Sequence, residues 1–270
     1  MSDRKYEEAS VGKTVSRNMH GPSSKENGTY LYAIVSNSVS RIYGAFGING
    51  GTVYTISDGD VAAVVSDVPN GKIRPERRHL AAHQEVLRRF MEESAVLPMS
   101  FGIIANGPNA VRKVLSRNRD AVLGQLERVA GKVEMGLRIA WDVPNIFEYF
   151  VNTHPELRAA RDRFLGGRRE PTREDKIEVG RMFDRILQED REAHTETVEE
   201  ILAPLCGAIK RNPPRDEREV ANLACLVERD ARKRFEDGVL EAARLFDNNF
   251  AFDFNGPWAP HNFVHVALEV

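Results

Sequence analysis

The sequence has few residues suited to covalent or redox chemistry, and it lacks the motifs in which such residues usually act. Its two cysteines, Cys206 and Cys225, form no CxxC pair and no disulfide framework, so we expect two buried thiols in a reducing compartment. There is no GxSxG nucleophile turn, no GxxxxGK[ST] phosphate loop and no GxGxxG dinucleotide fingerprint. These absences favour a protein that binds other molecules over an enzyme.

Long hydrophobic runs are missing, and so is an excess of charge of one sign. No segment approaches the roughly 20 apolar residues that cross a bilayer, and the first residues lack the apolar core of a signal peptide. The 38 basic and 40 acidic residues give a net charge of -2, and acidic residues interrupt the arginines between residues 158 and 173. We therefore predict a cytoplasmic protein that binds neither a membrane nor a nucleic acid.

The first 28 residues are polar, mixed in charge and nearly free of large aliphatic side chains. Such a segment buries too little surface to offset the entropy lost on ordering it, so we predict a disordered, mobile tail over residues 1–28. The remaining length suits two domains. We predict an α+β domain over residues 29–131 and a second α+β domain over residues 132–270.

The first domain is predicted from apolar periodicity and turn signals. Asp58 and Gly59 separate two strand-like runs, which indicates a β-hairpin closed by a type I′ turn. Pro75 opens an amphipathic helix, and the glycine-rich stretch that contains Gly44 is expected to be a loop. The predicted strands cover residues 30–35, 52–57, 60–67 and 95–101, and the predicted helices cover residues 75–93 and 109–130.

The second domain is predicted to follow the element order of a ferredoxin-like fold. Thr172 and Asp175 resemble a capping box at the start of a long helix, whose polar stretch 188–197 should lie in solvent. The predicted strands cover residues 132–143, a short run near 209, 219–228, 250–254 and 262–268, and the main helices cover residues 172–205 and 231–246. This order of β, α, β, β, α, β suits a modified ferredoxin-like fold.

Two histidines, His79 and His83, lie four residues apart in the first predicted helix. That spacing can place both rings on one metal ion. The sequence is not HExxH, and it offers no identifiable third ligand. A partly exposed, hydrogen-bonding pair near the start of the helix is the other interpretation.

The densest aromatic group lies near the end of the sequence and consists of Phe250, Phe252, Phe254, Trp258 and Phe263. Alternation places the first three rings on one face of a strand, where they form either core or an apolar docking surface. We expect Trp258 to wedge this segment against a domain. If the ring is buried, Trp258→Ala should cost about 3–5 kcal/mol, whereas an exposed ring would be a docking candidate.

Three motifs together carry a family resemblance: Ala82-His-Gln-Glu-Val86, Val96-Leu-Pro-Met-Ser-Phe-Gly102 and Gly256-Pro-Trp-Ala-Pro-His-Asn-Phe-Val264. In this order and at this spacing, the chain from Tyr30 onward resembles the gas vesicle protein GvpF/GvpL family. It departs from the usual family pattern in two places. Leu-Arg is common where Met99-Ser100 stand, and Pro-Pro-Tyr is common where Ala259-Pro260-His261 stand.

The resemblance implies two α+β domains, of which the second is a modified ferredoxin-like fold. It implies no catalytic residue, no cofactor and no metal. It also implies a role in gas vesicle organisation, and so in buoyancy, for a protein of the cytoplasm and the gas vesicle that contacts the hydrophobic shell protein GvpA and other accessory proteins during assembly. The candidate docking or framework residues are His83, Pro98, Phe101, Gly102, Phe252, Gly256, Pro257 and Trp258.

Two other functions remain open from the sequence. Ferredoxin-like domains often sense small molecules, so a sensor module is one alternative. An enzyme with an unrecognised site, built on His79, His83 and a carboxylate, is the other. Both alternatives rest on fold analogy or on a single pair of residues.

Overall fold

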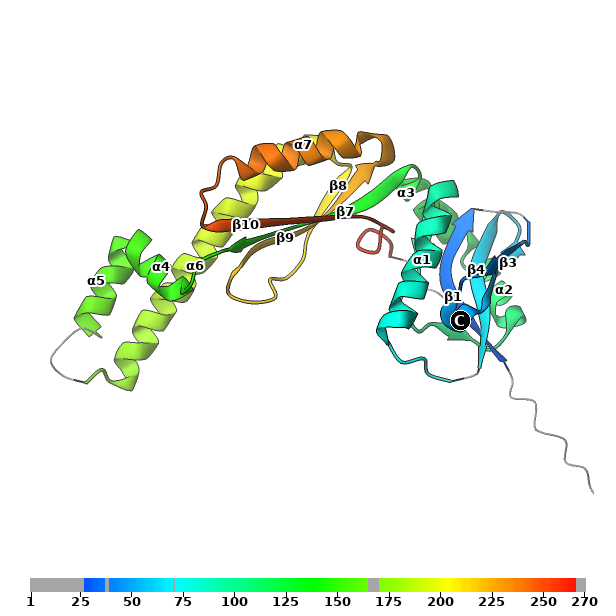
Figure 1. Cartoon of the computed structure of the whole chain (residues 1–270), viewed down its shortest axis with the longest axis horizontal. Coiled ribbons are helices and arrows are strands. Elements are labelled where there is room, and N and C mark those ends of the chain that lie inside the picture. Colours follow the sequence, from blue (N-terminus) through cyan, green and yellow to red (C-terminus); the bar gives the residue numbers. More distant parts are fainter. Residues whose placement is uncertain (1–26, 37–38, 70, 165–169, 266–270) are drawn as a thin grey trace, which may run out of the picture.

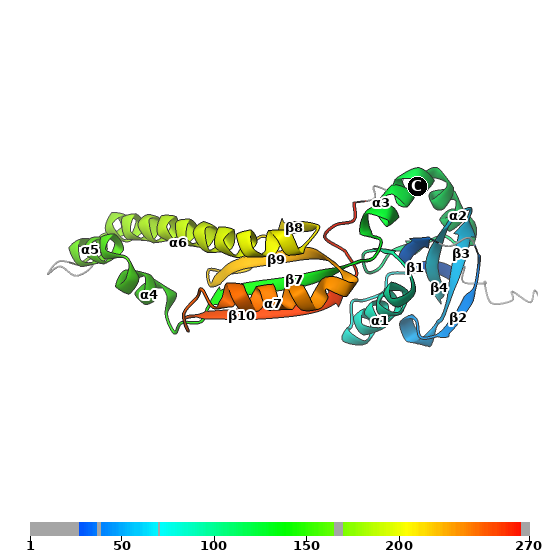
Figure 2. The same ribbon diagram turned by 90° about the horizontal axis from the view of Figure 1, so that it is seen from above.

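The computed structural model describes residues 27–36, 39–69, 71–164 and 170–265. Figures 1 and 2 show an elongated, arched molecule with one sheet and its helices at one end and a second sheet in the middle. A helical arm extends from the second sheet to the opposite end. The combination of helices with antiparallel sheets agrees with the predicted α+β class.

The first sheet has the order β2-β3-β4-β1-β5, with β6 paired to β1, and its strands are antiparallel. Helix α1 covers one face, and helices α2 and α3 cover the other. The central strands are therefore apolar on both faces, which is why they read as almost continuous hydrophobic runs. The elements are β1 (Asn27–Ser36), β2 (Ile42–Ala45), η1 (Ile48–Gly50), β3 (Thr52–Asp58), β4 (Val61–Pro69), α1 (Arg77–Glu93), β5 (Val96–Pro98), β6 (Ile104–Ala105), α2 (Pro108–Arg117) and α3 (Arg119–Val129).

The second sheet has the order β10-β7-β9-β8 and is also antiparallel. Helices α6 and α7 cover one face of it, and α4 and α5 pack on the first half of α6 to form the arm (Figure 2). The elements are β7 (Lys132–Trp141), α4 (Ile146–Thr153), α5 (Pro155–Phe164), α6 (Arg173–Leu202), η2 (Ala203–Leu205), β8 (Ala208–Arg211), β9 (Glu219–Glu228), η3 (Arg229–Ala231), α7 (Arg232–Ala243) and β10 (Phe250–Trp258). A domain boundary near residue 131 stays a prediction.

The hairpin between β3 and β4 is present, but its turn lies one residue further on than predicted. Asp58 pairs with Val61, so Gly59 and Asp60 form the two-residue loop. Gly59 has a φ of 62°, and Asp60 has no positive φ. A type I′ turn needs positive φ at both central residues, so that prediction is wrong; a glycine at the first central position is typical of type II′.

Three other predictions for the first sheet need correction. The glycine-rich stretch contains strand β2, with Gly44 at a bulge where the register shifts between Ile42 and Gly44. The single helix predicted over residues 109–130 is broken at Asn118, which ends α2 and precedes α3. Strand β1 begins at Asn27 because it pairs with the end of β4, so the predicted tail is shorter by two residues; residues 1–26 lie outside the described part.

The capping box at the start of α6 is confirmed. The Asp175 amide donates to Thr172 Oγ1 at 3.1 Å, and the Thr172 amide donates to Asp175 Oδ2 at 2.8 Å. The polar stretch 188–197 of α6 was predicted to lie in solvent, and this is only partly correct. Some of its side chains contact backbone carbonyl groups at the start of β9. Arg191 Nε donates to the Glu219 carbonyl at 2.8 Å. The hydroxyl of the buried Thr195 lies 2.7 Å from the Arg191 carbonyl and 3.3 Å from the Val220 carbonyl.

The last predicted strand, over residues 262–268, is wrong in the part that can be described. Residues 262–265 form turns and extended chain after the end of β10, and the rest lies outside the described residues. Strand β10 is instead longer than predicted and runs to Trp258. Residues 256–265, which we call the C-terminal segment, comprise the last three residues of β10 and the chain that follows them alongside α1.

Candidate functional site: the junction of α1 with the C-terminal segment

Seven of the eight predicted site residues lie around α1 and the C-terminal segment that passes beside it. His83 lies on α1, and three of the others follow from the end of β5. The C-terminal segment supplies the remaining three. The residues of this junction are His83, Pro98, Phe101, Gly102, Gly256, Pro257 and Trp258.

Phe252 does not belong to the junction. Its ring lies 5.2 Å from that of Phe246, just beyond α7, and the neighbouring Phe254 ring lies 5.9 Å from Phe235. The alternating rings of β10 therefore do share one face, and that face packs beneath a helix. The core interpretation of these three rings is confirmed.

His83 lies at the centre of the junction and is only 2% exposed. Its Nδ1 lies 2.9 Å from the Tyr30 hydroxyl, which also accepts a 3.0 Å hydrogen bond from the Gly102 amide. The rings of Tyr32 and Phe101 lie 5.6 and 5.8 Å from the imidazole. The Tyr30 hydroxyl has one proton and two acceptor sites, so it can bond to either tautomer of His83 while it accepts from Gly102.

Burial lowers the pKa of His83 to about 4, the proximity of His261 adds to this effect, and the Met99 backbone opposes it. The imidazole is therefore neutral at pH 7. Nε2 has no hydrogen-bond partner among the described residues. The predicted partial exposure of His83 is wrong, because aromatic rings surround it.

His79 has different partners from His83. Its Nδ1 lies 2.9 Å from the Arg74 carbonyl, and its Nε2 lies 2.9 Å from Asn49 Oδ1 in η1. Both of its ring nitrogens are thus engaged in fixing loops, so the two histidines do not converge on one point. Within the described residues, no group of three or more His, Cys, Asp or Glu side chains is arranged to hold a metal ion.

The C-terminal segment is held by a close turn and by a buried carboxylate. Gly256 has a φ of 124°, and a Cβ at this position would lie 3.0 Å from the Glu134 carbonyl, so glycine is required. The Asn262 amide donates to Glu134 Oε2 at 2.8 Å, and its Nδ2 donates to Oε1 at 2.7 Å. Burial raises the pKa of Glu134, while Asn262 and Lys210 oppose that shift.

Two further residues of the segment enter the core. Ala259 is buried in the cluster that joins α1 to the second sheet, and Phe263 is buried against Ala224 and Leu226 of β9. Arg229, beyond the end of β9, donates to the Glu92 carbonyl of α1 at 3.1 Å. The segment therefore ties the second sheet to α1.

Trp258 is 44% exposed, so the prediction that it wedges the segment against a domain is wrong. Its ring lies over a groove of about 190 Å³ that Pro257, Ala81 and Gln84 also line. Its Nε1 donates to Asn255 Oδ1 at 2.8 Å. Ala259 and Phe263 are the residues that fasten the segment, which leaves Trp258 as a docking candidate.

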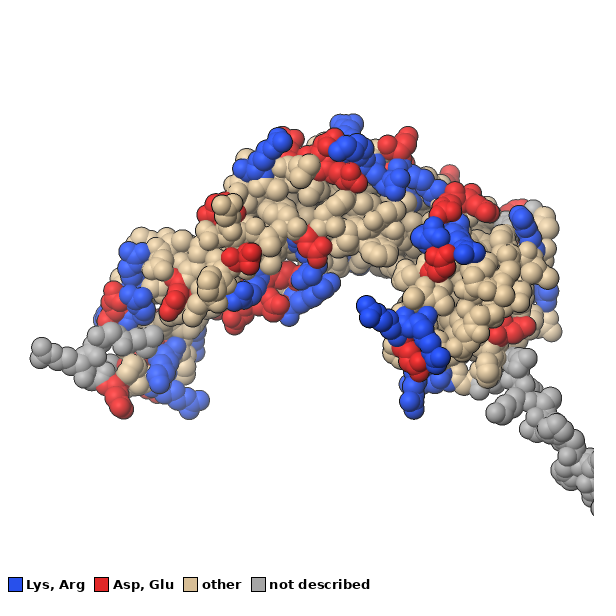
Figure 3. All heavy atoms as spheres, viewed as in Figure 1, with Lys and Arg blue, Asp and Glu red and all other residues tan. Residues whose placement is uncertain are grey.

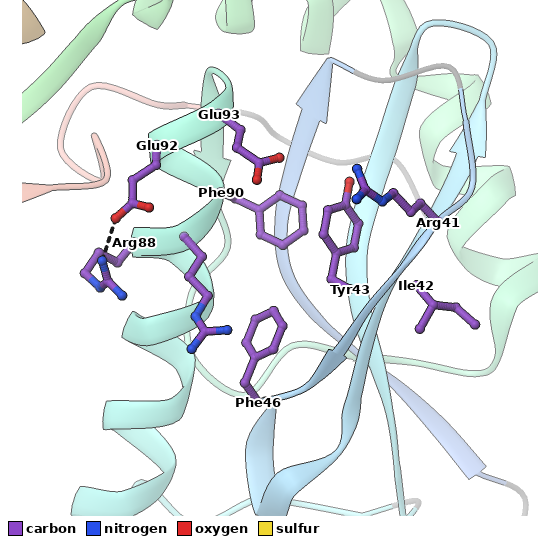
Figure 4. Close-up of a pocket in the computed structure, with 9 residues that line it drawn as sticks. Arg41, Ile42, Tyr43, Phe46, Arg88, Phe90, Glu92 and Glu93 are labelled. Carbon is purple, nitrogen blue, oxygen red and sulfur yellow. Dashed lines mark hydrogen bonds and ion pairs between the residues drawn. The ribbon is translucent and has the colours of Figure 1, made fainter.

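Sequence reasoning missed a second surface, a hollow of about 450 Å³ between β2 and α1 (Figure 4). Tyr43 and Phe46 point from the strand side toward Phe90 on α1, and the Tyr43 and Phe90 rings are 4.6 Å apart. The alternation in Arg41-Ile-Tyr43 was a signal for this strand. The glycines that follow it obscured that signal.

The two cysteines are free, as predicted, but only Cys225 is fully buried. Cys206 is half-buried, and its thiol donates to the Leu202 carbonyl at 2.9 Å. Within the described residues, no helix combines the length and the apolar character needed to cross a membrane. On the face shown in Figure 3, basic and acidic side chains of the described residues are interleaved without a continuous basic stripe.

Fold and site together define a class of protein: two antiparallel sheets with helices on their faces, tied together by a C-terminal segment, with grooves open along α1. The chain belongs to the gas vesicle GvpL/GvpF family. The family model described as "Gas vesicle synthesis protein GvpL/GvpF" matches residues 28–265.

Individual relatives agree with this assignment. Gas vesicle protein F of Streptomyces sp. (strain CB03234) is 30% identical over 241 residues, which cover 87% of this chain and 99% of the relative. Gas vesicle protein L of the same strain is 26% identical and covers 89% of this chain and 94% of the relative. Gas vesicle protein F of Dolichospermum flosaquae is 24% identical, with 88% and 97% covered.

Solved structures share the fold. The crystal structure of GvpF from Anabaena sp. PCC7120 superposes with a TM-score of 0.78 at 23% identity, covering 89% of this chain and 99% of that one. GvpF from Microcystis aeruginosa superposes with a TM-score of 0.75 at 20% identity, with 88% and 99% covered. At this level of identity the likeness concerns the fold.

Proposed function

We propose that this protein is an accessory protein of gas vesicle assembly, that it binds the hydrophobic shell protein GvpA, and that it also contacts other accessory proteins. The observation that carries this proposal is the match of the family model to residues 28–265. The relatives named gas vesicle protein F and L, matched over most of their length, support it.

The physical case rests on exposed apolar surface. A very hydrophobic shell subunit needs a partner before it polymerises, and a protein with an apolar groove or a free strand edge can supply one. Trp258 lines an apolar groove beside α1, and β2 is an edge strand that carries the exposed Ile42. Both are open, whereas the aromatic face of β10 is covered by α7.

We also propose that the protein acts by binding rather than by catalysis, in the cytoplasm and at the gas vesicle, and without a nucleic acid or membrane partner. The interleaved surface charges in Figure 3 support the exclusion of nucleic acid. The engagement of both nitrogens of His79 speaks against an enzyme built on the two histidines. A thermal-shift screen with metal ions and metabolites tests the sensor and enzyme alternatives, since a ligand would raise Tm.

The two sheets are proposed to correspond to two domains, residues 29–131 and 132–270, the second a modified ferredoxin-like fold. The element order β7-α6-β8-β9-α7-β10 supports this classification, with α4 and α5 as the modification. Limited proteolysis tests it: cleavage near residue 131 that leaves two resistant fragments is expected, and cleavage scattered through the first sheet would contradict it.

Co-purification tests the binding proposal. The protein is expressed in one cell with the shell protein, and an unrelated α+β protein of matched solubility serves as the control. Specific recovery of the shell protein is the expected result. Recovery no better than the control, also when other accessory proteins are present, would contradict the proposal.

A further inference from the structure

The backbone of the second sheet brings the two cysteines together, although they are distant in sequence. Cys206 lies in the turn that joins the end of α6 and η2 to β8, and Cys225 lies within β9. The Gly207 amide, next to Cys206, donates to the Leu226 carbonyl, next to Cys225, at 2.8 Å. Strand β8 then pairs with β9 so that Ile209 stands opposite Cys225. The two cysteines are therefore neighbours where β8 begins.

Both thiols also enter the same part of the core. Cys225 is fully buried in the main hydrophobic cluster, and the half-buried Cys206 packs against that cluster. On β9, Cys225 shares a face with Leu223 and Val227, and this face lies beneath α6 and α7. Cys206 reaches it from the end of α6, where its Sγ lies 2.9 Å from the Leu202 carbonyl. There the two thiols form a hydrogen bond with each other.

The two thiols differ in acidity and in exposure. The hydrogen bond with Cys225 lowers the pKa of the Cys206 thiol, and burial opposes this shift. The hydrogen bond with Cys206, together with burial, raises the pKa of the Cys225 thiol. Cys206 is therefore the sulfur that forms a thiolate more readily and that solvent reaches, while Cys225 keeps its proton in the core. An accessible cysteine of lowered pKa beside a second cysteine is typical of a redox-sensing pair.

The position of the pair gives a bond between the two sulfurs a structural consequence. Helix α6 runs from the arm to the second sheet, and Cys206 follows its last turn (Figure 1). A disulfide from Cys206 to Cys225 would fasten the end of this helix covalently to β9. The sequence contains two cysteines in all, so each is the only disulfide partner that the chain offers to the other.

We propose that Cys206 and Cys225 form a reversible disulfide when the protein meets a peroxide, and that this bond locks the end of α6 onto β9. In a reducing compartment the pair remains two thiols, as it is in the structure. This inference is independent of shell-protein binding and adds a redox-sensitive element to the fold.

The chemistry balances with hydrogen peroxide as the oxidant. The Cys206 thiolate attacks one peroxide oxygen, the O–O bond breaks, and the departing hydroxide takes up a proton to become water. The Cys225 sulfur then attacks the sulfur of the Cys206 sulfenic acid. The S–S bond forms, the S–O bond breaks, and the oxygen leaves as a second water with the Cys225 proton. Two thiols thus lose two electrons, one peroxide yields two waters, and an added thiol reductant restores the pair by exchange.

Mass spectrometry of the intact full-length chain tests this proposal. The reduced protein is treated with hydrogen peroxide, the peroxide is removed with catalase, and the chain is unfolded in iodoacetamide. Without peroxide two alkyl groups are expected. After peroxide none is expected on a chain that remains monomeric, and both return when dithiothreitol is added before alkylation.

Two single variants separate the roles of the cysteines. In Cys225→Ala, Cys206 is expected to stop at the sulfenic acid and to be labelled by dimedone, because no second thiol resolves it. In Cys206→Ser, Cys225 should stay free and react with peroxide about tenfold or more slowly than Cys206 does in the other variant. Circular dichroism checks that both variants fold, and Cys206→Ala replaces the serine variant if it does not.

Several results would overturn the proposal. One is oxidation of wild-type Cys206 to a sulfinic or sulfonic acid while Cys225 stays free, and another is a disulfide that joins two chains. Two free thiols after prolonged exposure to excess peroxide would overturn it as well. If the disulfide forms, amides over residues 203–208 are expected to exchange more slowly than in the reduced chain, and unchanged exchange there would contradict the locking of α6.

Discussion

The two sides of α1 differ in how completely their groups are satisfied. On the side of the C-terminal segment, the Glu134 carboxylate has two donors from Asn262, and Phe263 is buried. On the side of β2, the strand stands at the edge of the sheet among the described strands, and Ile42 is exposed. One side of the helix is therefore fastened by buried contacts of the C-terminal segment, and the other side faces an open hollow.

This difference predicts that the junction side of α1 contributes mainly to stability and the β2 side mainly to binding. Closed contacts already contribute their free energy to the folded chain, so their loss should appear in unfolding. Open apolar groups contribute little to folding and can lose their exposed surface only when a partner covers them. Variants of the junction and variants of the β2 side should thus have opposite effects in the two assays.

The largest effect is expected for Phe263→Ala. Removal of a buried phenylalanine leaves a cavity against Ala224 and Leu226, and the free energy of unfolding should fall by about 3–5 kcal/mol. Urea denaturation of the full chain measures it. A loss below about 1 kcal/mol would mean that the C-terminal segment is not fastened as described.

The pH dependence of the free energy of unfolding should reveal the lowered pKa of His83. Its folded pKa of about 4 lies below the unfolded value of about 6.5, so the unfolded chain binds more protons between these values. This contribution is complete above about pH 6.5 and is lost as the pH falls toward 4, by about 3 kcal/mol in all.

The comparison variant for that measurement is His83→Gln. The other groups that face His83 are Tyr30, Tyr32, Phe101 and His261, and burial also lowers the pKa of His261, so a smaller slope of the same sign should remain. Unfolding curves at intervals between pH 4 and 7 give the difference. Parallel stability profiles of wild type and variant would contradict the account of a neutral, buried imidazole.

Asn262→Ala should cost about 1–3 kcal/mol, because it removes the side-chain donor to the buried Glu134 carboxylate. The backbone donor of residue 262 remains. In the background of Glu134→Gln the same substitution should cost less, since no buried charge is left. A double-mutant cycle in urea tests this, and fully additive costs would show that the two side chains are not coupled.

Trp258→Ala should cost about 1 kcal/mol, well below the value for a buried tryptophan, because 44% of the residue is exposed. The same variant is also informative in the shell-protein assay. Unchanged recovery is expected if the β2 edge is the docking surface. A strong loss of recovery with intact stability would move the site to the junction.

The smallest effect on folding is expected for Ile42→Lys and Arg41→Glu. Both side chains are exposed, so the free energy of unfolding should change by no more than about 0.5 kcal/mol. Urea midpoints measured beside the recovery assay check this. A larger destabilisation would show that Ile42 and Arg41 contribute to folding, as the junction residues do.

Much of the fold could be predicted because local signals and the final structure agree. The apolar face of α1, the Thr172 capping box and the apolar run of β9 each depend on residues close in sequence. Strand β2 was missed because one glycine lies within it and three follow it closely, which masks a short edge strand. The break at Asn118 was missed because helical spacing continues across it.

The candidate site was predicted in part. The family motifs identified His83, Phe101 and Gly256, and the structure brings their elements together. Sequence alone did not show that Trp258 is exposed while Phe263 is buried, because that depends on a register shift in β10 after Asn255. The hollow could not be predicted, since Tyr43 and Phe90 meet only when β2 and α1 pack.

Hydrogen exchange of the complex with shell protein tests the central claim most directly, namely that the β2 side of α1 contributes mainly to binding while the junction side contributes mainly to stability. The account predicts that amides over residues 39–46 and 88–93 gain protection when shell protein is bound and that residues 256–264 exchange as before. Protection confined to residues 256–264, with none over residues 39–46, would contradict it.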